Sequence, residues 1–97
     1  MKLSETKRRA SIYVCAHRRR DDDPLGGGCG SRGDAVYEAI RSAIGARAAW
    51  SRAWVAKTSC LGVCPRVGCA VGVAPTGAVL DECEPEDADV ILDTLSV

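Results

Sequence analysis

The chain of 97 residues lacks several features on which common protein classes depend. It has no phenylalanine, and a single histidine, His17, gives no basis for a Ser-His-Asp catalytic trio. No stretch approaches the roughly 20 consecutive apolar residues that a membrane-spanning helix needs. Residues 1–11 are polar and basic, without the apolar core of a secretory signal. These absences predict a cytosolic protein that does not enter the membrane.

Two motifs of other protein classes are missing as well. There is no phosphate-binding P-loop and no Cys-x-x-Cys of the kind that thiol-disulfide oxidoreductases place at a helix start. Basic and acidic residues balance at 13 each, so electrostatics favour neither nucleic acid nor an anionic membrane as the partner. We therefore expect no enzymatic activity, no nucleic-acid binding and no membrane binding.

The residues that are present suit one small domain. Hydrophobic residues make up 46% of the chain, enough for a packed core, although a domain this short gains much from a metal. We interpret residues 1–10 as a flexible basic tail and residues 11–97 as the single folded domain. Nothing resembling a linker or an internal repeat divides it.

Hydrophobic periodicity predicts the order β-α-β-β-β-α. Short β-rich runs cover residues 11–15 and 52–59, and between them apolar residues recur at three- and four-residue steps from Val36 to Ile44. Residues 69–74 and 78–81 read as a hairpin around Thr76 and Gly77. Pro85 suits the first turn of a last helix. We expect an α/β fold with a mixed four-stranded sheet flanked by two helices.

Six cysteines in a reducing compartment indicate metal or redox chemistry rather than a disulfide framework. A β-α-β crossover makes the first two strands parallel, so their ends meet at one edge of the sheet. Cys15 ends the first strand and Cys60 the second, Cys29 directly precedes the helix, and Cys64 follows Cys60 after three residues. Four thiols from distant parts of the sequence should therefore converge at this edge.

A [2Fe-2S] cluster suits such a place. Its charge, with four thiolates, requires hydrogen-bond donors aimed at sulfur, and glycine-rich loops and a helix N-terminus can supply them. Zinc also accepts four thiolates, but zinc ribbons usually combine two close cysteine pairs, which the gap of 13 residues between Cys15 and Cys29 does not match. A Rieske centre needs two histidines and is excluded. The glycines in question are Gly26, Gly27, Gly28, Gly30 and Gly62.

The sequence resembles the thioredoxin-like [2Fe-2S] ferredoxins over residues 11–95. The resemblance is carried by Ile-Tyr-Val-Cys15, by Cys29-Gly-Ser-Arg-Gly33 entering a helix, and by Cys60-Leu-Gly-Val-Cys64. The hairpin at residues 71–77 and the Pro-Glu-Asp start of the last helix match as well.

The resemblance implies a thioredoxin-like fold and a cluster bound by Cys15, Cys29, Cys60 and Cys64. It also implies a homodimer that carries single electrons between redox proteins, at a low reduction potential. An accessory, redox-sensing or cluster-delivery role would use the same ligands, so the sequence leaves these alternatives open. A zinc-binding structural domain and a thiol-disulfide oxidoreductase are the weaker alternatives.

The chain departs from the family pattern at one position, where Cys69 stands after Gly68 in place of the usual proline. The third strand should lie beside the first and antiparallel to it, which puts Cys69 near the cluster. It could be a spare ligand, an alternative to Cys64, or a packed thiol. Cys83 ends the fourth strand, two strands or about 10 Å from the first, and is a poor candidate ligand.

Overall fold

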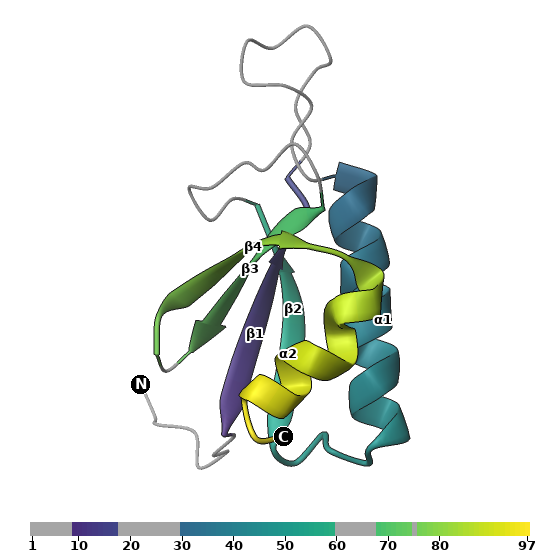
Figure 1. Cartoon of the computed structure of the whole chain (residues 1–97), viewed down its shortest axis with the longest axis vertical. Coiled ribbons are helices and arrows are strands. Elements are labelled where there is room, and N and C mark those ends of the chain that lie inside the picture. Colours follow the sequence, from purple (N-terminus) through teal and green to yellow (C-terminus); the bar gives the residue numbers. More distant parts are fainter. Residues whose placement is uncertain (1–8, 18–29, 60–67, 75) are drawn as a thin grey trace, which may run out of the picture.

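The computed structural model describes residues 9–17, 30–59, 68–74 and 76–97. Of the tail predicted over residues 1–10, residues 1–8 lie outside this set and remain a prediction, whereas Ala10 is buried and already belongs to the first strand. The order β-α-β-β-β-α is confirmed (Figure 1). The elements are β1 (Ala10–Cys15), α1 (Gly30–Ala46), β2 (Ala53–Thr58), β3 (Cys69–Ala74), β4 (Ala78–Cys83), the short 3-10 helix η1 (Pro85–Asp87) and α2 (Ala88–Thr94).

The strands form one mixed four-stranded sheet in the order β2-β1-β3-β4. The crossover through α1 makes β1 and β2 parallel, and β3 returns antiparallel to β1, as expected. Strand β4 ends at Cys83, as expected for that cysteine, and is therefore two residues longer than the range 78–81. The extension passes through an irregularity in its pairing with β3, where Glu82 takes a positive φ of 54°. A β-bulge of this kind is not visible in hydrophobic periodicity.

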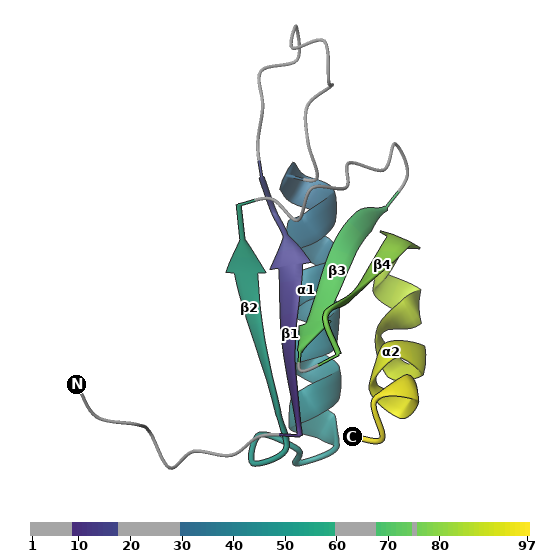
Figure 2. The same cartoon turned by 90° about the vertical axis from the view of Figure 1, so that its left-hand side faces the viewer.

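Both helices cover the same face of the sheet (Figures 1 and 2). On that face Ile12, Val14 and Val71 are fully buried, because alternate residues of a strand point to the same side. They share the core with apolar residues of α1 and α2, and fully burying one such side chain stabilises the fold by about 1.5–3 kcal/mol. The helical partners are Val36, Ile40 and Ile44 of α1 and Ala88, Ile91 and Leu92 of α2.

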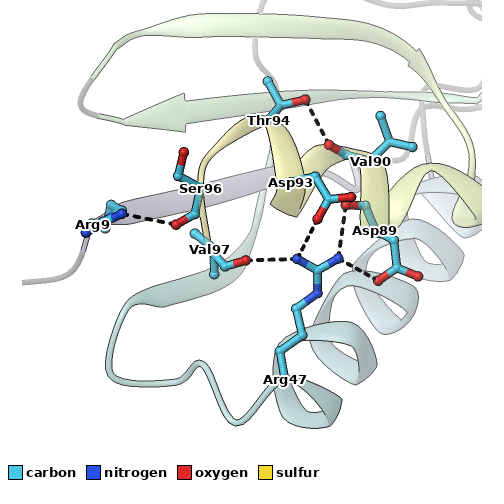
Figure 3. A network of polar contacts seen from close by, with 8 residues as sticks. All are labelled: Arg9, Arg47, Asp89, Val90, Asp93, Thr94, Ser96 and Val97. Atoms are coloured by element: carbon cyan, nitrogen blue, oxygen red, sulfur yellow. Dashed lines mark hydrogen bonds and ion pairs between the residues drawn. The ribbon is translucent and has the colours of Figure 1, made fainter.

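The last helix is fastened to α1 through Arg47, just beyond the end of α1 (Figure 3). Its guanidinium donates to the carbonyl oxygen of Val97 at 2.8 Å and to the Oδ1 atoms of Asp89 and Asp93 at 3.0 and 2.9 Å. A planar guanidinium can satisfy several acceptors at once, which an ammonium cannot do in the same geometry. Arg47 therefore fixes the C-terminal turn against α1.

We expect Arg47→Ala to destabilise the docking of α2 without disturbing the sheet, because the Arg47 guanidinium joins the end of α1 to the carboxylates of Asp89 and Asp93. Amide hydrogen exchange should become faster over residues 88–95 and stay unchanged in β1 and β3. Arg41→Ala is the matched control, since Arg41 is bonded within α1 to the hydroxyl of Tyr37 at 3.3 Å. Unchanged protection of α2 in Arg47→Ala would show that apolar packing alone holds the helix.

Candidate metal centre

The described part of the predicted site lies at the carboxyl end of β1. Cys15 is the last residue of that strand and is fully buried. It lies opposite Thr58 in the parallel ladder with β2, and the N–H of Ala16 donates to the carbonyl oxygen of Thr58 at 3.0 Å. The Cys15 thiol itself donates to the carbonyl oxygen of Ser59 at 3.8 Å. The ends of β1 and β2 therefore meet, as the crossover argument requires.

The N-terminus of α1 is pressed against the same edge. A Cβ at Gly33 would lie only 2.0 Å from the carbonyl oxygen of Cys15 and 3.1 Å from the Cα of Ala16. No side chain fits there, so glycine at this position lets the first turn of α1 touch the backbone of β1. The N–H of Gly30, which opens the helix, donates to the carbonyl oxygen of His17 at 3.0 Å.

An ion pair fastens the same turn of α1 to the neighbouring strand. Lys57 of β2 lies 3.2 Å from Oδ1 of Asp34, and its ammonium lies 5.0 Å from the centre of the Tyr37 ring. Both charged side chains are more than a third exposed, so the pair contributes at most about 1 kcal/mol. It helps to orient the helix end that faces Cys15.

Three of the four predicted ligands, Cys29, Cys60 and Cys64, lie outside the described residues. Their neighbours in the sequence are described. Gly30, which follows Cys29, and Ser59, which precedes Cys60, both contact the end of β1. Within the described ranges, no three His, Cys, Asp or Glu side chains gather in a way that could hold a metal ion.

Cys69 and Cys83 lie on the other side of β1 from β2. Cys69 begins β3, the neighbour of β1, and is fully buried in the core. Cys83 ends β4, two strands from β1, as expected. Burial raises the pKa of Cys83 from 9.0 to about 11, and the carboxylates of Asp87, Asp81 and Glu84 add to this shift. Cys83 is therefore a neutral thiol at physiological pH.

Two features of this edge were not predicted from the sequence. One is the contact of Gly33 with β1, whose only sequence signal is the glycine in the first turn of a helix. The other is that Cys69 and Cys83 face each other as partners in the ladder between β3 and β4. The bulge shifts this register, so counting residues back from the hairpin does not pair the two cysteines.

The fold and this edge define a thioredoxin-like α/β domain whose first helix starts beside a buried cysteine. Solved structures of thioredoxin-like [2Fe-2S] ferredoxin from Aquifex aeolicus share this architecture, which confirms the resemblance expected from the sequence. The wild-type protein superposes with a TM-score of 0.79 at 26% identity, covering 93% of this chain and 88% of that one. A second structure of that ferredoxin gives 0.78 at 26% identity, covering 91% and 80%.

Two cysteine-to-serine variants of the same ferredoxin each superpose with a TM-score of 0.77 at 25% identity, covering 88% of this chain and 84% of theirs. No family model matches the chain, and no curated protein matches it. The similarity is therefore carried by fold and by low but consistent sequence identity. Along the described segments, no helix combines the length and apolarity needed to cross a bilayer.

Proposed function

We propose that the protein is a cytosolic one-electron carrier that binds a single [2Fe-2S] cluster through Cys15, Cys29, Cys60 and Cys64. The observation that carries the proposal is the meeting of three chain segments at the end of β1. Cys15 belongs to one of them, and Gly30 and Ser59, neighbours of Cys29 and Cys60, belong to the other two. The structural likeness to the Aquifex aeolicus [2Fe-2S] ferredoxin supports the same cofactor.

The residues at this edge fit such a cluster. Four cysteines supply the all-sulfur donor set that [2Fe-2S] clusters use, and bound to iron they are thiolates. The N-terminus of α1 adjoins Cys15, where its positive dipole end favours negative charge. When bound, the cluster supplies the one-electron redox chemistry. The protein's part is to hold the sulfurs, exclude water from buried Cys15 and stabilise the negative charge.

The potential of the bound cluster tests the carrier role. We expect a midpoint potential well below 0 mV, with roughly −400 mV for plant-type ferredoxins as the guide, because all-cysteine ligation retains a net negative charge. A dithionite titration followed by visible absorption measures it. A midpoint above 0 mV would contradict the role of a low-potential electron carrier.

The partners are a redox protein that donates or accepts the electron and, in addition, a second copy of this chain. The face of the sheet opposite the helices carries three large apolar side chains, Tyr13, Trp54 and Val79, that are 40%, 47% and 42% exposed. Trp54 pairs with Ser11, which points to the same face as Tyr13 because the two are two residues apart on β1. Tyr13 and Val79 both pair with Gly72 of β3, so all three apolar side chains lie on one face. Such a row is typical of an apolar surface that a partner covers.

The dimer is tested by light scattering after size-exclusion chromatography, where we expect twice the mass of one chain. Trp54→Glu should shift the protein to the monomer, because it puts a charge into the apolar row at its most exposed side chain. Val90→Glu is the matched control, since Val90 is 62% exposed on α2 and away from this face. A monomeric wild type, or dissociation by Val90→Glu alone, would rule out this interface.

A further inference from the structure

Two buried cysteines take no part in the proposed cluster, and they lie side by side. Cys69 and Cys83 are direct partners in the antiparallel ladder of β3 and β4. Cys69 is fully buried and Cys83 is 5% exposed, and both belong to the core cluster. Side chains of directly opposed residues project from the same face of a sheet, so the two thiols are neighbours.

The spacing of such partners suits a covalent bond. The Cα atoms of opposed residues in an antiparallel ladder lie about 4.5 or 5.5 Å apart. Disulfides join cysteines whose Cα atoms are usually about 4.4–6.8 Å apart. Both kinds of ladder position therefore fall within the range that a disulfide spans.

The pair sits where the ladder is irregular. Val71 pairs with Leu80 and Cys69 with Cys83, so β4 uses Asp81 and Glu82 where β3 uses only Ala70. Glu82 and Gly68 have positive φ values of 54° and 66°, and a bulge of this kind interrupts the hydrogen bonds between strands. A bond between the two sulfurs would join β3 to β4 at the point where backbone pairing is weakest.

The surroundings of Cys83 disfavour its thiolate and so slow the oxidation of the pair. Its thiol donates to the carbonyl oxygen of Asp81 at 3.9 Å, and burial beside three carboxylates raises its pKa to about 11. Because the thiolate is the attacking species in disulfide exchange, oxidation of this pair should be slow. Neither cysteine is in a disulfide in the structure.

We propose that Cys69 and Cys83 form a reversible cross-strand disulfide, a two-electron site separate from the four cysteines proposed to bind the cluster. The oxidant is a low-molecular-weight disulfide such as oxidised glutathione. Two S–H bonds break and one bond forms between the Sγ atoms. The two electrons and two protons pass to the small disulfide, whose S–S bond breaks and which leaves as two thiols.

The disulfide would stabilise β4, which lies at the edge of the sheet. Among the described strands, β4 pairs with β3 alone. Its end at Cys83 leads directly into η1 and α2, which pack against α1. Closing the loop between Cys69 and Cys83 also restricts the unfolded chain. The oxidised protein should therefore unfold at a higher temperature than the reduced one.

The sequence allows the oxidation state of Cys69 and Cys83 to be measured separately from that of the other four cysteines. No lysine or arginine follows Arg66, so trypsin releases residues 67–97 as one peptide that contains only Cys69 and Cys83. The purified chain of 97 residues is equilibrated with reduced and oxidised glutathione at several ratios, alkylated and digested, and the peptide masses are measured by mass spectrometry. At oxidising ratios we expect this peptide to lose two hydrogen atoms and to resist alkylation. When this peptide is cleaved after Glu82, the fragments that contain Cys69 and Cys83 should separate only after reduction.

The result that overturns the proposal is a peptide that carries two alkylated cysteines, or only mixed disulfides with glutathione, at every ratio. The same holds if the disulfide forms only in denaturant. Cys69→Ala and Cys83→Ala serve as controls, in which oxidation should no longer raise the midpoint of thermal unfolding. Because the readout contains none of the four proposed ligands, its outcome is independent of whether the chain binds iron.

Discussion

Replacing Cys15 by serine should abolish the cluster while leaving the domain folded. Serine nearly conserves the volume of the buried side chain, and its hydroxyl can donate to the carbonyl oxygen of Ser59, as the thiol does. A hydroxyl is a much poorer ligand than a thiolate for iron in an iron–sulfur cluster. We expect the purified variant to lose most of its visible absorption, iron and sulfide. The far-ultraviolet circular dichroism spectrum should be unchanged.

The matched control is Cys83→Ser. Cys83 is buried almost as fully as Cys15 and ends a strand in the same way, so both variants share the cost of burying a hydroxyl. Cys83 lies two strands from β1, and its replacement should leave iron, sulfide and colour at the level of the wild type. Loss of the cluster in Cys83→Ser together with normal spectra in Cys15→Ser would refute the assignment of ligands.

Gly33→Ala should cause the largest loss of stability among single-residue changes at this edge. The new methyl group would meet three backbone atoms of Cys15 and Ala16 at 2.0–3.1 Å, and backbone cannot move aside as a flexible side chain can. Overpacking of this kind costs about 1–3 kcal/mol and occasionally more, and here we expect the upper end of that range. Chemical denaturation measures the loss, and the displaced helix start should also lower the cluster content.

Gly45→Ala tests the same exchange at the other end of α1. Its Cβ would meet only Nε1 of Trp50, at an ordinary contact distance of 3.8 Å. Alanine is favoured over glycine within a helix by about 0.5–1 kcal/mol, so this variant should be slightly more stable than the wild type. Equal effects of the two substitutions would show that Gly33 does not serve the close contact with Cys15.

Hydrophobic periodicity and chain connectivity were sufficient to predict most of the fold. The apolar steps from Val36 to Ile44 mark the buried side of α1, and all three of the helix's large aliphatic core residues follow them. The parallel pairing of β1 and β2 follows from the crossover between them. The bulge at Glu82 could not be predicted, because it depends on how β4 fits against β3 rather than on local propensity.

Chain connectivity also predicts part of the site. The meeting of the ends of β1 and β2 with the start of α1 is a consequence of topology, and the contacts of Cys15, Gly30 and Ser59 agree with it. The pairing of Cys69 with Cys83 depends on a register that the sequence does not reveal. The positions of Cys29, Cys60 and Cys64 lie outside the described residues and remain predictions from the sequence.

The central claim is that the chain binds one [2Fe-2S] cluster. The most direct test is a visible absorption spectrum of anaerobically purified protein, with iron, sulfide and zinc measured on the same sample. We predict broad visible bands that bleach with dithionite, and two irons and two sulfides per chain. A colourless protein with one zinc per chain would contradict the claim and identify a structural zinc domain instead. Absence of both metals after anaerobic handling would contradict it as well and would favour thiol-disulfide chemistry.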